Sequence, residues 1–191
     1  MAFSIPNSTT QSWWLLYLRS GLFAGIGVLV VFAGNSQSFI GIALSALLII
    51  AGLLAIRFRQ VSRIPGTATN WFLIAGLLDI IAGLALLFYF HHPDQGIVLV
   101  FGAWGILIGL IQAVEAMYVF IGLQTSVESP NMSGTLIHFL NVIICGGIAF
   151  IFLLQPLGDD STQVAGWFFI ALSVTLLLLT RRLQVEEENQ P

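Results

Sequence analysis

The sequence has little charge for its length. Of 191 residues only 15 are charged, 6 basic and 9 acidic, or 8%, whereas a soluble domain carries roughly 25%. It contains no lysine and a single cysteine. Such a chain cannot cover a water-facing globule with polar surface, and it lacks the basic face that a nucleic-acid-binding protein needs. The composition excludes a soluble enzyme, a disordered chain and a nucleic-acid binder, and it predicts the lipid bilayer as partner.

Long apolar runs take the place of the missing charge. Hydrophobic residues make up 58% of the chain, and a membrane-spanning helix needs about 20 mostly apolar residues. Barrel strands would be about 10 residues long with alternating polarity, so the runs predict helices. The first run lacks the basic start of a signal peptide, and we interpret it as a retained helix. The six predicted spans are Trp13–Ala33, Phe39–Phe58, Asn70–Phe90, Gly96–Ile121, Thr135–Leu154 and Val164–Thr180.

The predicted fold is an all-α integral membrane bundle of six helices. We divide it into a cytoplasmic N-terminal segment (1–12), a transmembrane domain (13–180) with hairpins at 13–58, 70–121 and 135–180, and a polar, acidic cytoplasmic tail (181–191), which we expect to fray from Gln184 onward. With six spans, every arginine lies on the side of both termini, so the positive-inside rule predicts both termini in the cytoplasm. The arginines are Arg19, Arg57, Arg59, Arg63, Arg181 and Arg182.

Small residues recur at matching positions of the three predicted hairpins, which indicates a parallel threefold internal repeat. Because lipid tails are as apolar as leucine, close approach at small residues drives helix association. Two interpretations stay open, packing within the chain and a face for self-association into a homo-oligomer. The predicted helix-packing positions are Gly83, Gly102, Gly105, Gly109, Gly147 and Gly166. Gly21 and Gly25 have the GxxxG spacing, as do Gly105 and Gly109. The matching sets are Gly27, Gly83 and Gly147; Ser45, Gly102 and Gly166; and Gly52, Gly109 and Ser173.

The second hairpin carries a family resemblance. Its segment LLDIIAGLALLFYFHHPDQGIVLVFGAWGILIGLIQAVEAM resembles the repeat of the HdeD-like acid-resistance membrane proteins. In that repeat a glycine-containing helix, a short outer loop with proline and a G-x-W-x-x-x-x-G helix recur, matched here by Gly83, Pro93, Gly102, Trp104 and Gly109. The other hairpins match more loosely, and the first lacks the loop proline. The resemblance implies a six-span protein of the bacterial inner (plasma) membrane with a role in acid or envelope stress, and it supplies no catalytic residue, cofactor or agreed substrate.

Six polar side chains inside the spans are candidates for a polar layer in the cytoplasmic half. A charge at the membrane centre costs about 2.5–3.5 kcal/mol on insertion scales, so each one suggests a function. Asp79 shares a stripe with Gly76 and Gly83, and its short carboxylate needs a partner or a proton. Arg19 points away from Gly21 and Gly25. The six candidates are Arg19, Asp79, Gln112, Glu115, His138 and Asn141.

Structural explanations for these residues stay open. Arg19 can snorkel to the headgroups, and Glu115 can sit at the interface. His138 and Asn141 can be ordinary interhelical hydrogen-bonding groups. For Trp104 simple packing is an adequate explanation, and the same holds for Cys145.

The loop at residues 91–94 holds a further group of ionisable side chains. Its sequence, His-His-Pro-Asp, allows a metal site, a titrating pair of histidines or a solvated turn, and we favour the turn. The chain has no nucleophile elbow, phosphate loop or zinc motif, so we expect no catalytic, cofactor or metal site.

Three functions compete. The sequence favours a non-enzymatic membrane protein that acts through packing, oligomers or a partner. The second is a transporter or channel for protons or a small solute, but the outer half offers no polar lining and no span has the internal proline of a broken helix. An enzyme acting on lipid has only Asp79, Glu115 and His138 to offer and ranks last.

Overall fold

The computed structural model describes residues 13–32, 37–61, 68–89, 93–125, 132–158 and 160–188. These residues form helices and short turns, with no strand among them. Each helix is long and apolar enough to cross a membrane, so the predicted all-helical six-span bundle is confirmed. The helices are α1 (Trp13–Val31), α2 (Gln37–Val61), α3 (Ala68–Phe88), α4 (Pro93–Thr125), α5 (Met132–Leu154) and α6 (Asp160–Glu188).

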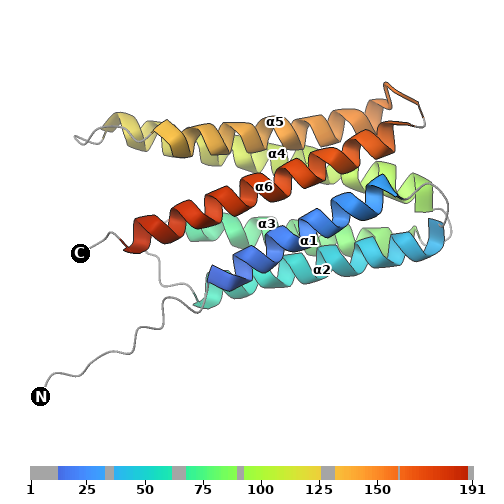
Figure 1. The fold of residues 1–191 in the computed structure, drawn as a ribbon, viewed down its shortest axis with the longest axis horizontal. Coiled ribbons are helices and arrows are strands. Elements are labelled where there is room, and N and C mark those ends of the chain that lie inside the picture. Colours follow the sequence, from blue (N-terminus) through green and yellow to red (C-terminus); the bar gives the residue numbers. More distant parts are fainter. Residues whose placement is uncertain are drawn as a thin grey trace, which may run out of the picture.

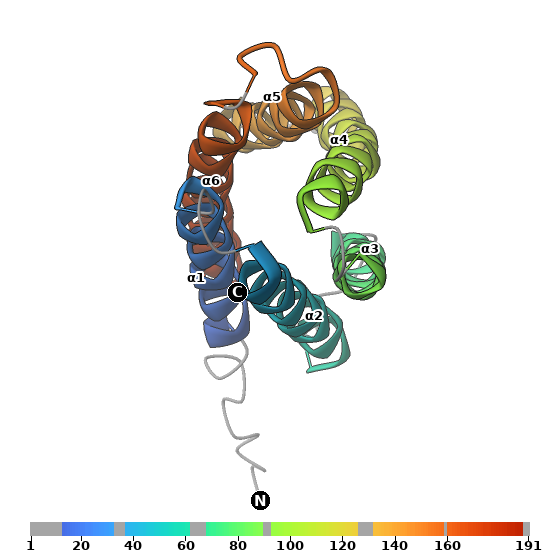
Figure 2. The same ribbon diagram turned by 90° about the vertical axis from the view of Figure 1, so that its right-hand side faces the viewer.

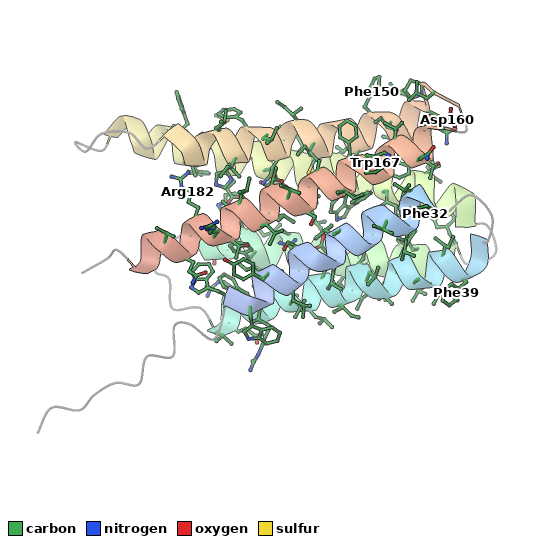
Figure 3. All side chains as sticks on the ribbon, viewed as in Figure 1. Phe32, Phe39, Phe150, Asp160, Trp167 and Arg182 are labelled. Carbon is green, nitrogen blue, oxygen red and sulfur yellow. The ribbon has the colours of Figure 1, made fainter. Side chains whose placement is uncertain are left out.

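The helices run up and down in chain order (Figure 1). We call the end where α1 begins and α6 ends the near end, and the opposite end the far end. Viewed along its length, the bundle is a ring in which each helix lies beside its neighbours in the chain and α6 closes against α1 (Figure 2). Arg182 and Asp160 lie at opposite ends of α6 (Figure 3).

α4 and α6 extend furthest beyond their predicted spans. α4 begins at Pro93 instead of Gly96, at a position where the missing proline N–H costs nothing. α6 begins at Asp160 instead of Val164 and continues to Glu188, so the expected fraying from Gln184 onward is wrong for the residues up to Glu188. The segment after Arg182 is rich in good helix formers. The Tyr17 hydroxyl also donates a hydrogen bond to Gln184 Oε1 at 3.1 Å, which ties this extension to α1.

The closest helix pairs lie between the predicted hairpins. The most extensive contacts join α2 to α3, α1 to α6 and α4 to α5, ahead of the two arms of any hairpin. The most extensive contacts therefore lie between different hairpins and not within one hairpin. Glycines explain why helices of different hairpins pack most closely. The glycines lie on the faces turned to the next hairpin, where they allow the two backbones to approach.

Glycines make backbone contacts in two of these pairs, α1 with α6 and α2 with α3. A methyl group on Gly27 would strike the carbonyl of Gly166 and the backbone of Ile170 on α6. One on Gly83 would strike the Ser45 carbonyl and Ile49 on α2. The Ser45 hydroxyl strengthens this second pair by donating a hydrogen bond to the Gly83 carbonyl.

The α2–α3 pair has a second close approach. Gly52 and Gly76 face each other across it, each against the other's carbonyl. Gly52 belongs to a matching set of the repeat and Gly76 to the stripe of Asp79, but neither is among the predicted packing positions.

The α4–α5 pair uses a different glycine. Gly105 lies against the backbone of Cys145 and Ala149, whereas Gly109 has room for a methyl group. A methyl group on Gly102 would meet the Leu153 side chain, and one on Gly147 would meet the Phe168 ring. Both glycines therefore face side chains and not a partner glycine.

Gly21 and Gly25 have far more space around them than Gly27, the third glycine of α1. A methyl group on Gly21 would have no neighbouring atom within 4 Å, and one on Gly25 would meet only Leu47 at 3.8 Å. The Gly21–Gly25 stripe therefore does not mark the interior face of α1.

Candidate functional site

Asp79 is the centre of the polar interior. Its side chain is completely buried on α3. One carboxylate oxygen accepts a hydrogen bond from Arg19 Nη2 at 2.8 Å, which is also an ion pair, and the other accepts from Trp104 Nε1 at 2.9 Å. Side chains from α1, α3 and α4 therefore meet at one carboxylate, and each of its oxygens has a donor.

Arg19 reaches Asp79 because it lies on the interior face of α1. Phe23, one turn later on the same face, is fully buried, and the Arg19 guanidinium lies 5.4 Å from its ring centre. Arg19 itself is 6% exposed. It does not snorkel to the surface, and the cation is compensated by a carboxylate and an aromatic face.

Trp104 belongs to this site although it was not among the predicted polar candidates. Packing alone does not explain its position. Its ring is 3% exposed, and its indole N–H donates a hydrogen bond to the Asp79 carboxylate. A signal was available: Trp104 lies well inside a span, and a buried indole N–H needs an acceptor. Asp79 is an acceptor of this kind, because its short carboxylate within a span needs a partner.

The other four candidates form a second cluster between α4 and α5. Gln112 Nε2 donates to Glu115 Oε2 at 3.3 Å, and Asn141 Nδ2 donates to Gln112 Oε1 at 3.4 Å. His138 Nδ1 lies 3.8 Å from Glu115 Oε2. Glu115 is largely buried within the bundle, with 12% of its side chain exposed.

A cavity of about 30 Å³ separates the two clusters. Side chains from five helices line it, α2 being the exception. Its polar lining comes from both clusters, and the rest of its wall is aromatic or aliphatic. The lining residues are Arg19, Phe23, Trp71, Phe72, Ala75, Trp104, Ile108, Gln112, Glu115, Asn141, Cys145, Leu172, Leu176 and Leu179.

An aromatic cluster closes this cavity on its far-end side. Phe101 and Phe169 contact the Trp104 ring at centroid distances of 6.4 and 5.6 Å, and Phe152 stacks on Phe101 at 5.6 Å. All three phenylalanines are fully buried. Phe101 and Phe169 lie about one turn, and Phe152 about two turns, toward the far end from the lining residues of their own helices, so apolar rings fill the bundle beyond the cavity.

The remaining candidates occupy simpler positions. Cys145 is buried against α4 and lines the cavity, as its predicted packing role requires. No group of three His, Cys, Asp or Glu side chains that could hold a metal ion occurs among the described residues. His91 and His92 lie outside them.

The geometry sets what the site can do chemically. Both oxygens of Asp79 are engaged, so this carboxylate is held as half of an ion pair. Glu115 and His138 are two ionisable groups side by side at the edge of a small polar cavity. The arrangement suits binding of protons or a small polar molecule better than nucleophilic chemistry.

Comparison with protein-family models, with curated proteins and with solved structures gave no match.

Proposed function

We propose that the protein is a non-enzymatic integral membrane protein of the HdeD-like type, which acts in acid or envelope stress in the bacterial inner membrane. Its six apolar spans support the membrane location. The engagement of both Asp79 oxygens supports the absence of catalysis, because no free, activated nucleophile results. The stress role rests on the sequence resemblance of the second hairpin.

We further propose that the near end faces the cytoplasm, with both termini there. Arg57, Arg59, Arg181 and Arg182 cluster at that end of the described helices. Asp160 lies at the far end. Under the positive-inside rule this distribution favours a cytoplasmic near end.

The packing supports the proposed threefold repeat. Gly27 and Gly83 occupy matching positions, and so do the residues that they meet, Gly166 with Ile170 and Ser45 with Ile49. The α4–α5 pair departs from this scheme. The position that matches Gly27 and Gly83 is Gly147 on α5, but the close backbone contact of this pair is made by Gly105 on α4.

The single observation that carries the functional proposal is that the cavity is one-sided. Its polar lining lies toward the near end, and buried aromatic rings close it toward the far end. A site of this form binds a proton or small polar ligand from the cytoplasmic side without passing it through. The alternative, a small transporter or channel, is favoured by the same polar cavity but requires the aromatic cluster to open.

Flux through reconstituted protein separates the two functions. Purified protein in liposomes that contain a pH-sensitive dye should conduct protons no faster than protein-free liposomes across an imposed pH gradient. The matched test of the barrier is Phe101→Ala, which opens the aromatic cluster and leaves the polar lining intact. Flux through the unmodified protein, abolished by Asp79→Asn, would establish the transport alternative instead.

A test in cells addresses the stress role. Deletion of the gene in its native host should lower survival after acid challenge, and the unmodified gene should restore it. Survival equal to that of the parent strain would remove the stress role while leaving the membrane fold untouched.

A further inference from the structure

Two residues that line the cavity each carry a buried polar side-chain atom with no hydrogen-bond partner within the described ranges. The two atoms are Arg19 Nε, a donor, and Asn141 Oδ1, an acceptor. Arg19 is 6% exposed and Asn141 is completely buried. An unsatisfied buried polar group costs about 1–3 kcal/mol, and buried groups of this kind are almost always paired with protein or with ordered water.

The cavity has the size and the chemistry to supply that partner. A water molecule needs roughly 10–15 Å³ of such volume, so about 30 Å³ accommodates about two. It also needs two to four polar partners. Arg19, Asn141, Gln112 and Glu115 all line the space and offer both donors and acceptors.

We propose that this cavity is a hydration site, in which ordered water bonds Arg19 Nε and Asn141 Oδ1. The inference deepens the proposed function by naming water as the resident ligand of the cytoplasm-facing cavity. It joins the Arg19–Asp79–Trp104 cluster to the Gln112–Glu115–Asn141 cluster. Glu115, which retains some exposure, is then connected by hydrogen bonds to the ion pair of the interior.

The charged and amide groups that face this water come from three of the five helices around it. α1 contributes Arg19 and α4 contributes Gln112 and Glu115, while α5 contributes Asn141. α3 and α6 contribute only apolar and aromatic lining, apart from the indole of Trp71. The water therefore sits against one side of the cavity.

The aromatic cluster next to the cavity provides an internal comparison. Phe23 lines the cavity, whereas Phe101 does not, and the two are 1% and 0% exposed. Both are fully buried phenylalanines with the same intrinsic reactivity. If the cavity holds water, Phe23 is the one of the two that lines the water site.

Hydroxyl-radical labelling measures this difference. A brief X-ray pulse makes radicals from water wherever water is bound, and the radicals oxidise side chains in contact with it. In the full-length protein in lipid nanodiscs, mass spectrometry should find Phe23 oxidised several-fold faster than Phe101. Equal and slow oxidation of the two rings would show that the cavity is dry and would overturn the proposal.

Two variants identify the water by its partners. Asn141→Leu removes the acceptor and fills space, so Phe23 oxidation should fall to the level of Phe101. Ser45→Ala removes a buried hydroxyl from the α2–α3 contact outside the cavity and should leave Phe23 oxidation unchanged. Unchanged Phe23 oxidation in Asn141→Leu would contradict the assigned partners. The comparison of the two rings in the unmodified protein needs no variant to fold.

The outcome is separable from that of the flux experiment. A labelled Phe23 together with measurable proton flux would retain the hydration site and reject the one-sided function. An unlabelled Phe23 without flux would reject the hydration site alone.

Discussion

A single arginine and a single aspartate define the interior of this bundle at the scale of residues. Arg19 and Asp79 are both buried, and their ion pair is completed by Trp104. In a membrane each charge alone would cost about 2.5–3.5 kcal/mol on insertion scales. Pairing offsets most of this cost, so both side chains can remain buried. The pair also joins α1, α3 and α4, of which α1 and α3 are not neighbours in the ring.

Removal of one member of the pair should be worse than removal of both. Arg19→Met leaves Asp79 charged and buried with Trp104 alone, and loss of one partner from a buried pair costs about 3–5 kcal/mol. Arg19→Met combined with Asp79→Asn removes both charges and retains an acceptor for Trp104. We expect the thermal unfolding temperature in detergent to fall clearly in the single variant and to recover in the double variant.

The exposed arginine Arg57 serves as the control for this pair. Arg57→Met at the near end should shift the unfolding temperature little, because the side chain is exposed and surface charge contributes about 0–1 kcal/mol. A double variant no more stable than Arg19→Met alone would contradict the account of the ion pair.

Packing at the scale of elements depends on which glycines face a neighbouring helix. α1 contains both kinds. Gly27 lies against the α6 backbone, and Gly21 has nothing near it. The GxxxG spacing of Gly21 and Gly25 points to a contact that this chain does not make within itself. Spacing along one helix cannot identify the face that a partner helix occupies.

These two glycines make a matched pair of substitutions on one helix. Gly27→Ala forces α1 and α6 apart, and overpacking of this kind costs about 1–3 kcal/mol. Gly21→Ala meets no atom and should be neutral or stabilising by up to about 1 kcal/mol, because alanine is the better helix former. Thermal unfolding in detergent measures both. Equal effects of the two changes would show that the α1–α6 contact does not depend on the glycine.

The whole molecule is a ring of six helices with a small cavity near the middle of its length, and the polar lining of that cavity lies on the near-end side. Arginines gather at the same end. The bundle is thus asymmetric along its length even where its helix pairs resemble one another. The proposed orientation agrees with this asymmetry, because the polar side of the cavity and the arginines would then both face the cytoplasm.

Orientation can be tested with single added cysteines. Leu157 at the far end and Val185 near the end of α6 are both exposed, and the native Cys145 is buried. A membrane-impermeant maleimide added to intact cells should label the Leu157→Cys variant and not the Val185→Cys variant. The reverse pattern would mean that the arginine-rich end faces outward.

Hydropathy was sufficient to predict the six spans and the all-helical fold from the sequence. Whether a run of about 20 residues is apolar is a local property, and the bilayer imposes the helix on it. The six polar candidates were likewise visible, because any ionisable residue within an apolar run is conspicuous. Helix ends were less accurate where good helix formers continue past the apolar run, as after Arg182.

Tertiary structure decided which of these residues meet. Arg19 and Asp79 are 60 positions apart, and Trp104 joins them from a third helix. The tight pairing of α1 with α6, the close approach at Gly27 instead of Gly21, and the closer approach of α5 to Gly105 than to Gly109 also appear only in the folded chain. The reason is geometric. Hydropathy determines that a segment crosses the bilayer, but contacts depend on how each helix is rotated about its axis and shifted against its neighbours, and side-chain packing across the whole bundle sets both.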